Sequence, residues 1–480
     1  MLNKSIKRNA VLSSVKTILS LIVPLITFPY ISRILQVEAI GRYNFSNSVV
    51  GYFVLLAELG IGTYALREGA RIRDNRELFS VFASEMLTFN LLSAGFSLLL
   101  LFVSAVFIPK LQEYSIFLAI LSVQIPLAAF GRTWIFNVYE EFGILALIQA
   151  AFQLLSTVLL FLFVHSPSDV YMYTVIYTLS AAASNLLYGT LCKKHMDLKR
   201  VSFSCLRPHI KPILIIFSTT VTTVIYVNSD ITILGWLVND EAVGLYSTAV
   251  KVYNIVKQVI LAVITVIIPR LTLYAETEHF NSFFNKVLKT LSLLILPAMT
   301  GLFLLSENVI DMIAGPEYLP AAMSLRLLSI ALGLSLFACL FASGVLLPNM
   351  QETPFLIATI ISAAANIILN FILIPQFHQN AAAFTTVIAE FLVLIICYGF
   401  ARKYISLKSV AKPLLSVGVG CGAIIAVCLA IKALSLSLYP ETILCVCLSV
   451  AAYCLVQLIL KNEAFLQAFN SVLKMLKKKR

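Results

Sequence analysis

The sequence predicts an all-α integral membrane protein with about 14 transmembrane helices. Three observations predict this class: the composition, the length of the apolar runs and an internal repeat. Of the 480 residues, 60% are hydrophobic and 12% are charged, whereas about a quarter of the residues are charged in soluble domains. One globular core cannot bury so much apolar surface. The helices therefore need lipid around them.

Fourteen apolar runs are long enough to cross a bilayer as helices, since about 20 residues span a hydrocarbon core of about 30 Å. Gln124, Pro126 and Arg132 interrupt the fourth run and make it the least regular. Pro24 and Pro29 remove backbone hydrogen bonds from the first helix and are expected to bend it. The runs cover residues 10–34, 43–66, 79–108, 114–137, 143–165, 169–191, 212–238, 243–268, 285–305, 319–347, 354–375, 380–400, 413–434 and 438–460.

A short motif between the first two predicted helices returns later in the chain. "VEAIGRYNF" at Val37–Phe45 matches "DEAVGLYST" at Asp240–Thr248, with an offset of 203 residues, which is 241 − 38 for the aligned glutamates. The apolar runs on both sides of the motif return at the same offset. Because glycine allows a tight backbone, Gly41 is expected to form the turn between helices one and two.

The repeat predicts two pseudo-symmetric lobes. An N-lobe at residues 1–200 holds helices one to six and a C-lobe at 201–403 holds helices seven to twelve. Residues 404–480 add helices thirteen and fourteen and a basic cytoplasmic tail. Six helices return the chain to its starting side, so both lobes have the same orientation. Parallel repeats of this kind place a substrate path at their interface and open it to each side of the membrane in turn. The alternative is a duplication kept only for packing.

The basic residues predict the orientation. With the N-terminus inside, most of the Lys and Arg in connecting segments are cytoplasmic, and Arg33, Arg42, Lys110 and Lys432 are the exceptions. This asymmetry places both termini in the cytoplasm. The net charge of +12 therefore comes from basic segments that hold the topology beside anionic lipids. It does not indicate a nucleic-acid partner.

The first 75 residues also resemble a known family. "FPYISRILQVEAIGRYNFSNSVVGYFVLLAELGIGTYALREGARIRD" at residues 28–74 is similar to the first helical hairpin of polysaccharide repeat-unit flippases. These are the Wzx-type O-antigen transporters of the multidrug/oligosaccharidyl-lipid/polysaccharide superfamily. The combination of F-P-Y-x-x-R, E-x-x-G-x-Y and L-R-E elements is specific, and the predicted two-lobe plan extends the resemblance along the chain.

The resemblance implies a multi-pass protein of the bacterial inner membrane. It would move an undecaprenyl-diphosphate-linked oligosaccharide from the cytoplasmic to the outer leaflet by alternating access, as a transporter and not an enzyme, with no cofactor and no metal. Membrane lipids and other polysaccharide-assembly proteins would be its partners. The identity of the glycan does not follow from the resemblance.

Ionisable residues inside the predicted spans are the candidate functional residues, since burying one in a bilayer costs from about 3 to over 10 kcal/mol. Cations along the path would replace the hydration of a diphosphate. Lys251 and Arg326 are the first candidates, with Lys16 as a third. The alternative for Lys251 is a packing pair with Glu390. The stretch "STTVTTVIYVNSDIT" at residues 218–232 is rich in hydroxyl and amide groups that could hydrogen-bond sugars, and it contributes Asn228 to the candidates. The alternative is that these residues pack helices together. Arg33 completes the predicted substrate-binding set.

An ion gradient is the expected energy source, because the sequence lacks a G-x-x-x-x-G-K-S/T phosphate loop. Glu58, Glu85, Asp230 and Glu390 are the candidate carriers of H⁺ or Na⁺, since burial favours a protonated carboxyl group. The alternative for Glu58 and Glu85 is simple solvation near the inner surface.

Two other functions fit parts of the pattern. A multidrug or toxin exporter of the same superfamily typically has twelve helices. A membrane glycosyltransferase or polymerase usually needs a large outer loop with catalytic residues, and the predicted connections are short. A zinc site at Cys192, His195, Cys205 and His209 is not expected, because their order differs from the usual ligand pattern and the segment is strongly cationic.

Overall fold

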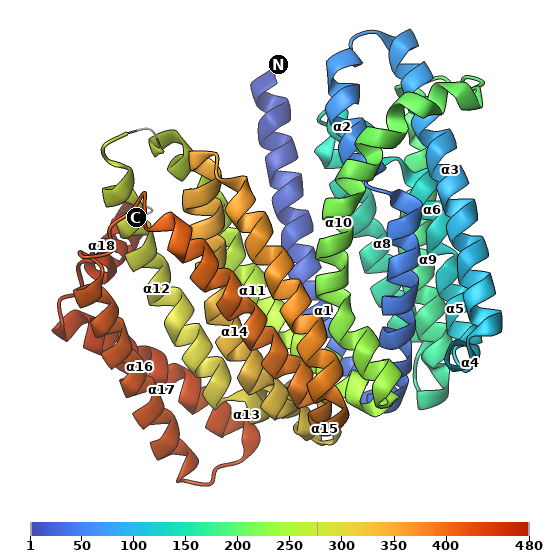
Figure 1. Ribbon diagram of the computed structural model, residues 1–480. Helices are drawn as coiled ribbons and strands as arrows, with labels where there is room; N and C mark the ends of the chain where they lie inside the picture. The colour runs from blue at the N-terminus through green and yellow to red at the C-terminus, as the bar shows by residue number, and fades with distance from the viewer. Residues whose placement is uncertain (1, 276, 479–480) are drawn as a thin grey trace. The chain divides into compact units, whose positions relative to one another are not determined.

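The computed structural model describes the backbone of residues 2–275 and 277–478. Outside the description lie the side chains of residues 2–18, 21, 219, 222, 223, 226, 227 and 471–478. The described chain consists of helices and short connections, which confirms the predicted all-α class (Figure 1). Within the described residues, 11 helices are long and apolar enough to cross a membrane. The chain is therefore an all-helical, multi-pass membrane protein.

The chain forms two compact units, unit 1 at Met1–Gly244 and unit 2 at Leu245–Arg480. In unit 1, α1 packs against α3, α8 and α10, and α9 packs against α6 and α8 (Figure 1). The elements of unit 1 are α1 (Leu2–Glu58), α2 (Ile61–Ile72), α3 (Arg76–Phe107), α4 (Pro109–Gln112), α5 (Ser115–Ser122), α6 (Gln124–Gly131), α7 (Thr133–Val138), α8 (Phe142–Phe163), the 3-10 turn η1 (Pro167–Asp169), α9 (Val170–Leu191), the 3-10 turn η2 (Cys192–Lys194) and α10 (Phe203–Leu237).

The first two predicted helices differ from the structure in where the chain bends. α1 runs through Pro24 and Pro29, and its non-helical residue is Gln36, with φ 65 and ψ 174. This bend separates the predicted first and second helices. The second helix is itself interrupted, because Leu59 and Gly60 adopt positive φ values of 47 and 70 before α2 begins. The predicted helix at 43–66 is thus two helices.

Gly41 does not form the turn that the sequence predicted. It lies inside α1, where an added Cβ would collide with the carbonyl oxygen of Asp240, the first residue of α11 (Asp240–Tyr274). Reciprocally, a Cβ on Gly244 would collide with the carbonyl oxygen of Val37. Both pairs, Gly41 with Gly244 and Val37 with Asp240, are related by the repeat offset of 203 residues (244 − 41 and 240 − 37). The repeated motif is therefore a close helix contact that requires residues without side chains.

Unit 2 contains the rest of α11 and the helices that follow it. α14 packs against α12 and α15, and α16 packs against α12 and α17 (Figure 1). Its further elements are α12 (Phe280–Leu304), α13 (Ser306–Ala314), the 3-10 turn η3 (Pro316–Ala321), α14 (Ala322–Phe341), the π-turn η4 (Ala342–Leu346), the 3-10 turn η5 (Leu347–Asn349), α15 (Glu352–Ala401), α16 (Ala411–Lys432), α17 (Leu438–Ile459) and α18 (Glu463–Lys478).

α15 contains two of the predicted helices, separated by a bend at His378 with φ 50 and ψ −131. A buried polar cluster links the two halves: the amide of Asn366 donates to the hydroxyl of Thr385 at 3.3 Å, and Thr385 donates to the amide oxygen of Asn370 at 2.5 Å. All three side chains are almost fully buried. Such hydrogen bonds hold helices together where apolar contact alone gives little preference over lipid.

Candidate functional site

A polar cavity of about 290 Å³ lies inside unit 1, between α1, α2, α3, α6, α7 and α10. Two helix breaks border it. One is Leu59–Gly60 between α1 and α2, and the other is Arg132 between α6 and α7, where φ is 47. Non-helical backbone is tolerated at membrane depth where it lines a cavity. The irregular fourth predicted helix is therefore three short helices, and its last break positions a charged side chain.

Arg132 is held in this cavity wall by neutral acceptors. Its Nη2 donates to the carbonyl of Gly189 at 2.7 Å and its Nε to the carbonyl of Phe130 at 3.1 Å. Gly189 lies in the last turn of α9, so the guanidinium also interacts with the negative end of that helix. The residue is only 8% exposed. Among the described residues, no carboxylate lies within ion-pair distance of it.

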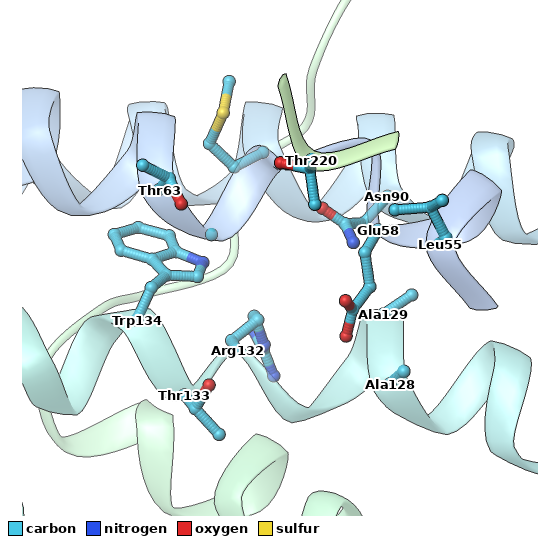
Figure 2. Close-up of a pocket in the computed structure, with 13 residues that line it drawn as sticks. Leu55, Glu58, Thr63, Asn90, Ala128, Ala129, Arg132, Thr133, Trp134 and Thr220 are labelled. Atoms are coloured by element: carbon cyan, nitrogen blue, oxygen red, sulfur yellow. The ribbon is translucent and has the colours of Figure 1, made fainter. Parts of the chain in front are cut away.

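Glu58 enters the same cavity from the last turn of α1 (Figure 2). Asn90 of α3 and Trp134 of α7 also line it. Within the described part of the chain, none of these three side chains makes a hydrogen bond or ion pair to protein. Trp134 packs against Phe79 and Phe82, with ring centroids 5.8 and 6.0 Å apart. The cavity therefore has two groups held in place by packing or hydrogen bonds, Arg132 and Trp134, and polar atoms on Glu58, Asn90 and Trp134 that can still form hydrogen bonds.

Glu85 belongs to a second polar group in unit 1. Its Oε2 lies 3.1 Å from Nε2 of His209, and Nδ1 of His209 lies 2.8 Å from the hydroxyl of Tyr64. The Glu85 and His209 side chains are only 14% and 15% exposed. The three residues come from α3, α10 and α2. The sequence did not indicate that His209 would be the partner of Glu85.

Glu390 pairs with Lys257 inside unit 2. Lys257 Nζ lies 3.4 Å from Glu390 Oε1 and donates to the Tyr253 hydroxyl at 2.8 Å. Tyr253 in turn donates to Ser335 at 3.4 Å. Lys257 lies inside the predicted span at 243–268 but was not among the predicted site residues. Its spacing of four residues from Tyr253 puts both on one helix face and is the signal that could have found it.

Arg326 and Lys251 belong to unit 2, and Arg33 belongs to unit 1. Arg326 donates to Glu307 at 2.7 Å and to Ser306 at 3.0 Å, in an ion pair whose side chains are 31% and 53% exposed. Lys251 is half-buried on α11, and Arg33 is exposed on α1. The side chain of Lys16 lies outside the described residues.

Asn228 and Asp230 lie on α10, in the stretch rich in hydroxyl groups. The hydroxyl of Thr232 lies 3.1 Å from those of both Ser48 and Tyr52 on α1. Asp230 is 7% exposed and Asn228 is half-buried. This end of the stretch therefore packs α10 against α1, as the alternative interpretation held, whereas Thr220 at its other end lines the cavity.

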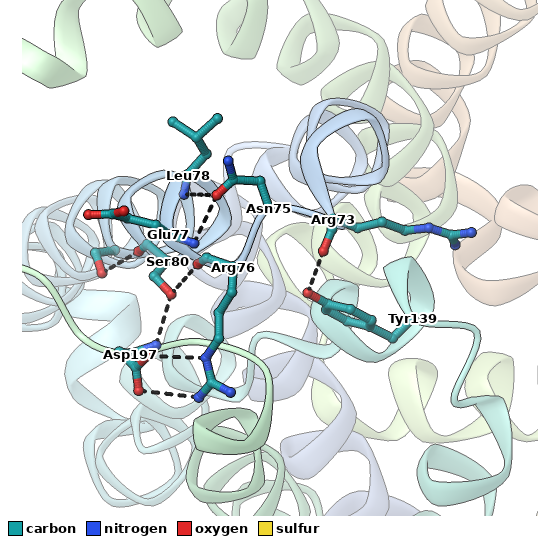
Figure 3. A network of polar contacts seen from close by, with 9 residues as sticks. Arg73, Asn75, Arg76, Glu77, Leu78, Ser80, Tyr139 and Asp197 are labelled. Carbon is teal, nitrogen blue, oxygen red and sulfur yellow. Dashed lines mark hydrogen bonds and ion pairs between the residues drawn. The ribbon is translucent and has the colours of Figure 1, made fainter.

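The segment after α9 is tied to the start of α3 (Figure 3). Arg76 donates from Nε to Asp197 at 3.2 Å, and the backbone N–H groups of Asp197 and Lys199 donate to Ser80 and Ser84 at 3.0 and 2.9 Å. These contacts fix the chain between α9 and α10 along one side of α3.

His195, one of the residues in the rejected zinc pattern, contacts an acid nearby. Its Nε2 lies 3.0 Å from Glu141, which also accepts from Lys194 at 2.8 Å. Burial raises the pKa of Glu141, but the hydrogen bonds and charges of Lys194 and His195 outweigh it and leave the pKa below its usual value. Among the described residues, no group of three or more His, Cys, Asp or Glu side chains is arranged to hold a metal ion.

An apolar cavity of about 520 Å³ lies in unit 2, between α12, α16, α17 and α18. Leu293, Pro297, Ile424 and Val450 are among its lining residues, and almost all of the lining is hydrocarbon. This apolar lining suits an aliphatic chain rather than a polar ligand.

Comparison with known sequences places the chain among proteins of glycan assembly. The family model described as "Polysaccharide biosynthesis protein" matches residues 6–275. The chain is 22% identical to a putative O-antigen transporter of Escherichia coli over 406 residues, 83% of this chain and 97% of that protein. It is 26% identical to a probable low-salt glycan biosynthesis flippase of Haloferax volcanii over 234 residues, 47% of this chain and 49% of that protein.

Solved structures share the fold. The lipid II flippase MurJ, in an inward closed conformation, superimposes with a TM-score of 0.76 at 18% identity, covering 96% of this chain and 100% of that one. An inward-facing multidrug resistance MATE family transporter of the MOP superfamily gives a TM-score of 0.57 at 13% identity, covering 82% and 99%. The fold is therefore MurJ/MATE-like.

Proposed function

This chain belongs to the polysaccharide biosynthesis protein family, and we propose that it is a flippase for an undecaprenyl-diphosphate-linked oligosaccharide repeat unit. It moves the repeat unit from the inner to the outer leaflet of the bacterial cytoplasmic membrane by alternating access. The likeness to an O-antigen transporter and to the MurJ fold supports a transporter without covalent chemistry.

The observation that carries the proposal is the pairing of two environments in unit 2. An apolar cavity of about 520 Å³ suits a lipid tail, and the same unit holds Lys257 and Glu390 as an ion pair, with side chains only 24% and 12% exposed. A lipid-linked sugar has an aliphatic tail and a polar head group, so it needs both environments. A multidrug exporter is the second candidate, but the lower TM-score with the MATE fold supports it less.

The full topology forms part of the proposal. Two of the 11 candidate spans, Ile22–Ile72 and Glu352–Ala401, each contain a bend and supply two crossings, and α10 adds one more, so 11 + 2 + 1 = 14. Both termini are cytoplasmic. The two lobes are the products of the 203-residue repeat, and helices thirteen and fourteen, α16 and α17, lie beside the lipid tail.

The substrate's diphosphate is bound by cations. The predicted substrate-binding residues keep that role: Lys251, Arg326, Lys16, Asn228 and Arg33. Lys257 is added to them as a cation that pairs with Glu390 when no substrate is bound. Replacing Lys251 or Arg326 by alanine should abolish surface glycan while the protein still inserts. Normal export in both variants would remove these residues from the mechanism.

Transport is driven by an H⁺ or Na⁺ gradient. Glu85 and Glu390 are the first two carriers, and each lies within ion-pair distance of a basic side chain, His209 and Lys257. Asp230 and Glu58 are the remaining carriers. Other polysaccharide-assembly proteins supply the substrate and receive the product.

The test is leaflet-specific detection of the lipid-linked glycan. In spheroplasts of a deletion strain, the glycan should accumulate where an added lectin cannot reach it, and the intact gene should restore lectin binding. Equal lectin binding with and without the gene would contradict the flippase function.

A further inference from the structure

We infer that the polar cavity of unit 1 binds one sugar residue of the transported head group. This inference rests on the proposed function and deepens it by assigning the glycan, rather than the diphosphate, to this cavity. It also gives Glu58, predicted as an ion carrier, the role of hydrogen-bond acceptor for sugar hydroxyls.

The first argument is the hydrogen-bonding inventory of the cavity. Glu58 offers only acceptors, the Trp134 indole only a donor, and Asn90 both. None of the three is used within the described protein. Figure 2 shows the Glu58 carboxylate and the Asn90 amide on the cavity side. A sugar hydroxyl donates and accepts at once, so a hydroxyl-rich ring can satisfy all three side chains.

The second argument is charge. The cavity contains one guanidinium, Arg132, and one carboxylate, Glu58, which are not in ion-pair contact among the described contacts. Their charges cancel, so neither a diphosphate nor a cation gains from the cavity as a whole. A neutral ligand with dipolar groups can contact both ends, which selects the sugar over the charged parts of the substrate.

The third argument is size and rigidity. At about 290 Å³, the cavity is at the lower limit of small-molecule sites, which measure about 300–1,000 Å³, and it fits one ring-sized group rather than a whole lipid-linked oligosaccharide. Arg132 is fixed by two carbonyl groups and Trp134 by two aromatic rings. Sites held in this way lose little entropy when a ligand binds.

The two tryptophans of the chain provide a direct assay. Trp134 lines the cavity, whereas Trp236 is 45% exposed on α10. In detergent-purified Trp236→Phe protein, Trp134 is the remaining tryptophan and can be excited selectively over tyrosine. We would titrate it with glucose, galactose, N-acetylglucosamine, rhamnose and glucuronate. At least one sugar should give a saturable fluorescence change, and Glu58→Gln and Asn90→Ala should each weaken its binding about tenfold or more.

Glu77→Gln is the matched control, because Glu77 is exposed in the first turn of α3 and does not line the cavity. It should bind like the parent protein. Size-exclusion profiles and unfolding temperatures would show that each variant is folded, and Glu58→Gln keeps the side-chain shape. No saturable change with any sugar, or equal binding in the cavity variants, would overturn the inference.

Export in cells separates this inference from the proposed function. If the flippase function fails, the intact gene will not restore surface glycan even if sugar binds. If only the sugar site fails, the intact gene restores export and Asn90→Ala, a variant of a cavity residue with no role in ion coupling, restores it equally well.

Discussion

Gly41 of α1 faces the backbone carbonyl of Asp240 at a separation that leaves no room for a side chain. The repeat-related Gly244 approaches the carbonyl of Val37 in the same way. The contact explains why the same short motif occurs twice, since each copy supplies the glycine that the other copy's backbone requires.

Gly41→Ala should destabilise the protein. The added methyl group must displace helix backbone, and overpacking of this kind costs about 1–3 kcal/mol. Thermal unfolding in detergent measures the effect. Gly95→Ala is the matched control, because Gly95 lies in α3 with open space around its Cβ position, and alanine favours a helix by up to about 1 kcal/mol. An unfolding temperature lowered equally in both variants would contradict the packing role.

Removing one member of the Lys257–Glu390 pair should be worse for stability than removing both. A single substitution leaves an uncompensated buried charge, which costs about 3–5 kcal/mol. Lys257→Met and Glu390→Gln should each lower the unfolding temperature, and the double variant should recover most of the loss without regaining glycan export. Arg326→Ala is the comparison, because its pair is more exposed and worth about 0–1 kcal/mol. Additive losses in the double variant would show that the two side chains are not coupled.

Glu85→Gln should uncouple transport from the gradient. Glutamine preserves the shape and can still hydrogen-bond His209, but it cannot carry a proton. In vesicles with an imposed pH gradient, the variant should flip substrate at a rate independent of the gradient, whereas the parent protein should respond to it. Asn90→Ala, in the sugar cavity, should lower the rate but keep the response. If the Glu85 variant responds like the parent protein, the coupling role is wrong.

The Glu141 cluster should make stability depend on pH. The pKa of Glu141 is lowered in the folded protein, so its contribution is complete above the ordinary glutamate pKa, about 4.3, and is lost as the pH falls through the lowered value. The difference in unfolding temperature between the parent protein and Glu141→Gln should be constant near neutral pH and shrink below about pH 4. Glu140→Gln, at a side chain 63% exposed, should show a smaller difference. A difference that grows on acidification would contradict this sign.

The sequence predicts the helices well because a bilayer sets their length and composition. The sequence does not predict where the helices bend. Gln36, Arg132 and His378 have backbone angles outside the helical region without being glycine or proline, so their conformations are imposed by packing. Local sequence cannot reveal this, and Gly41 indicated the wrong place for the turn between the first two predicted helices, which lies at Gln36.

The candidate site could be predicted only as a set of residue types. A charge inside a span signals function, but its partner depends on which helices are neighbours. Lys257 and Glu390 are 133 residues apart, and Glu85 and His209 are 124 apart. Glu58 and Arg132 meet at one cavity because two helix breaks come together there.

The way Arg132 is anchored determines how its surroundings respond to acid. Its guanidinium is held by the carbonyl groups of Gly189 and Phe130, which do not titrate. The guanidinium itself stays positive, because arginine is not deprotonated in proteins. The net charge of the cavity lining therefore follows the protonation state of Glu58. Protonation of this one carboxylate turns a balanced pocket into an electropositive one that attracts acidic sugars.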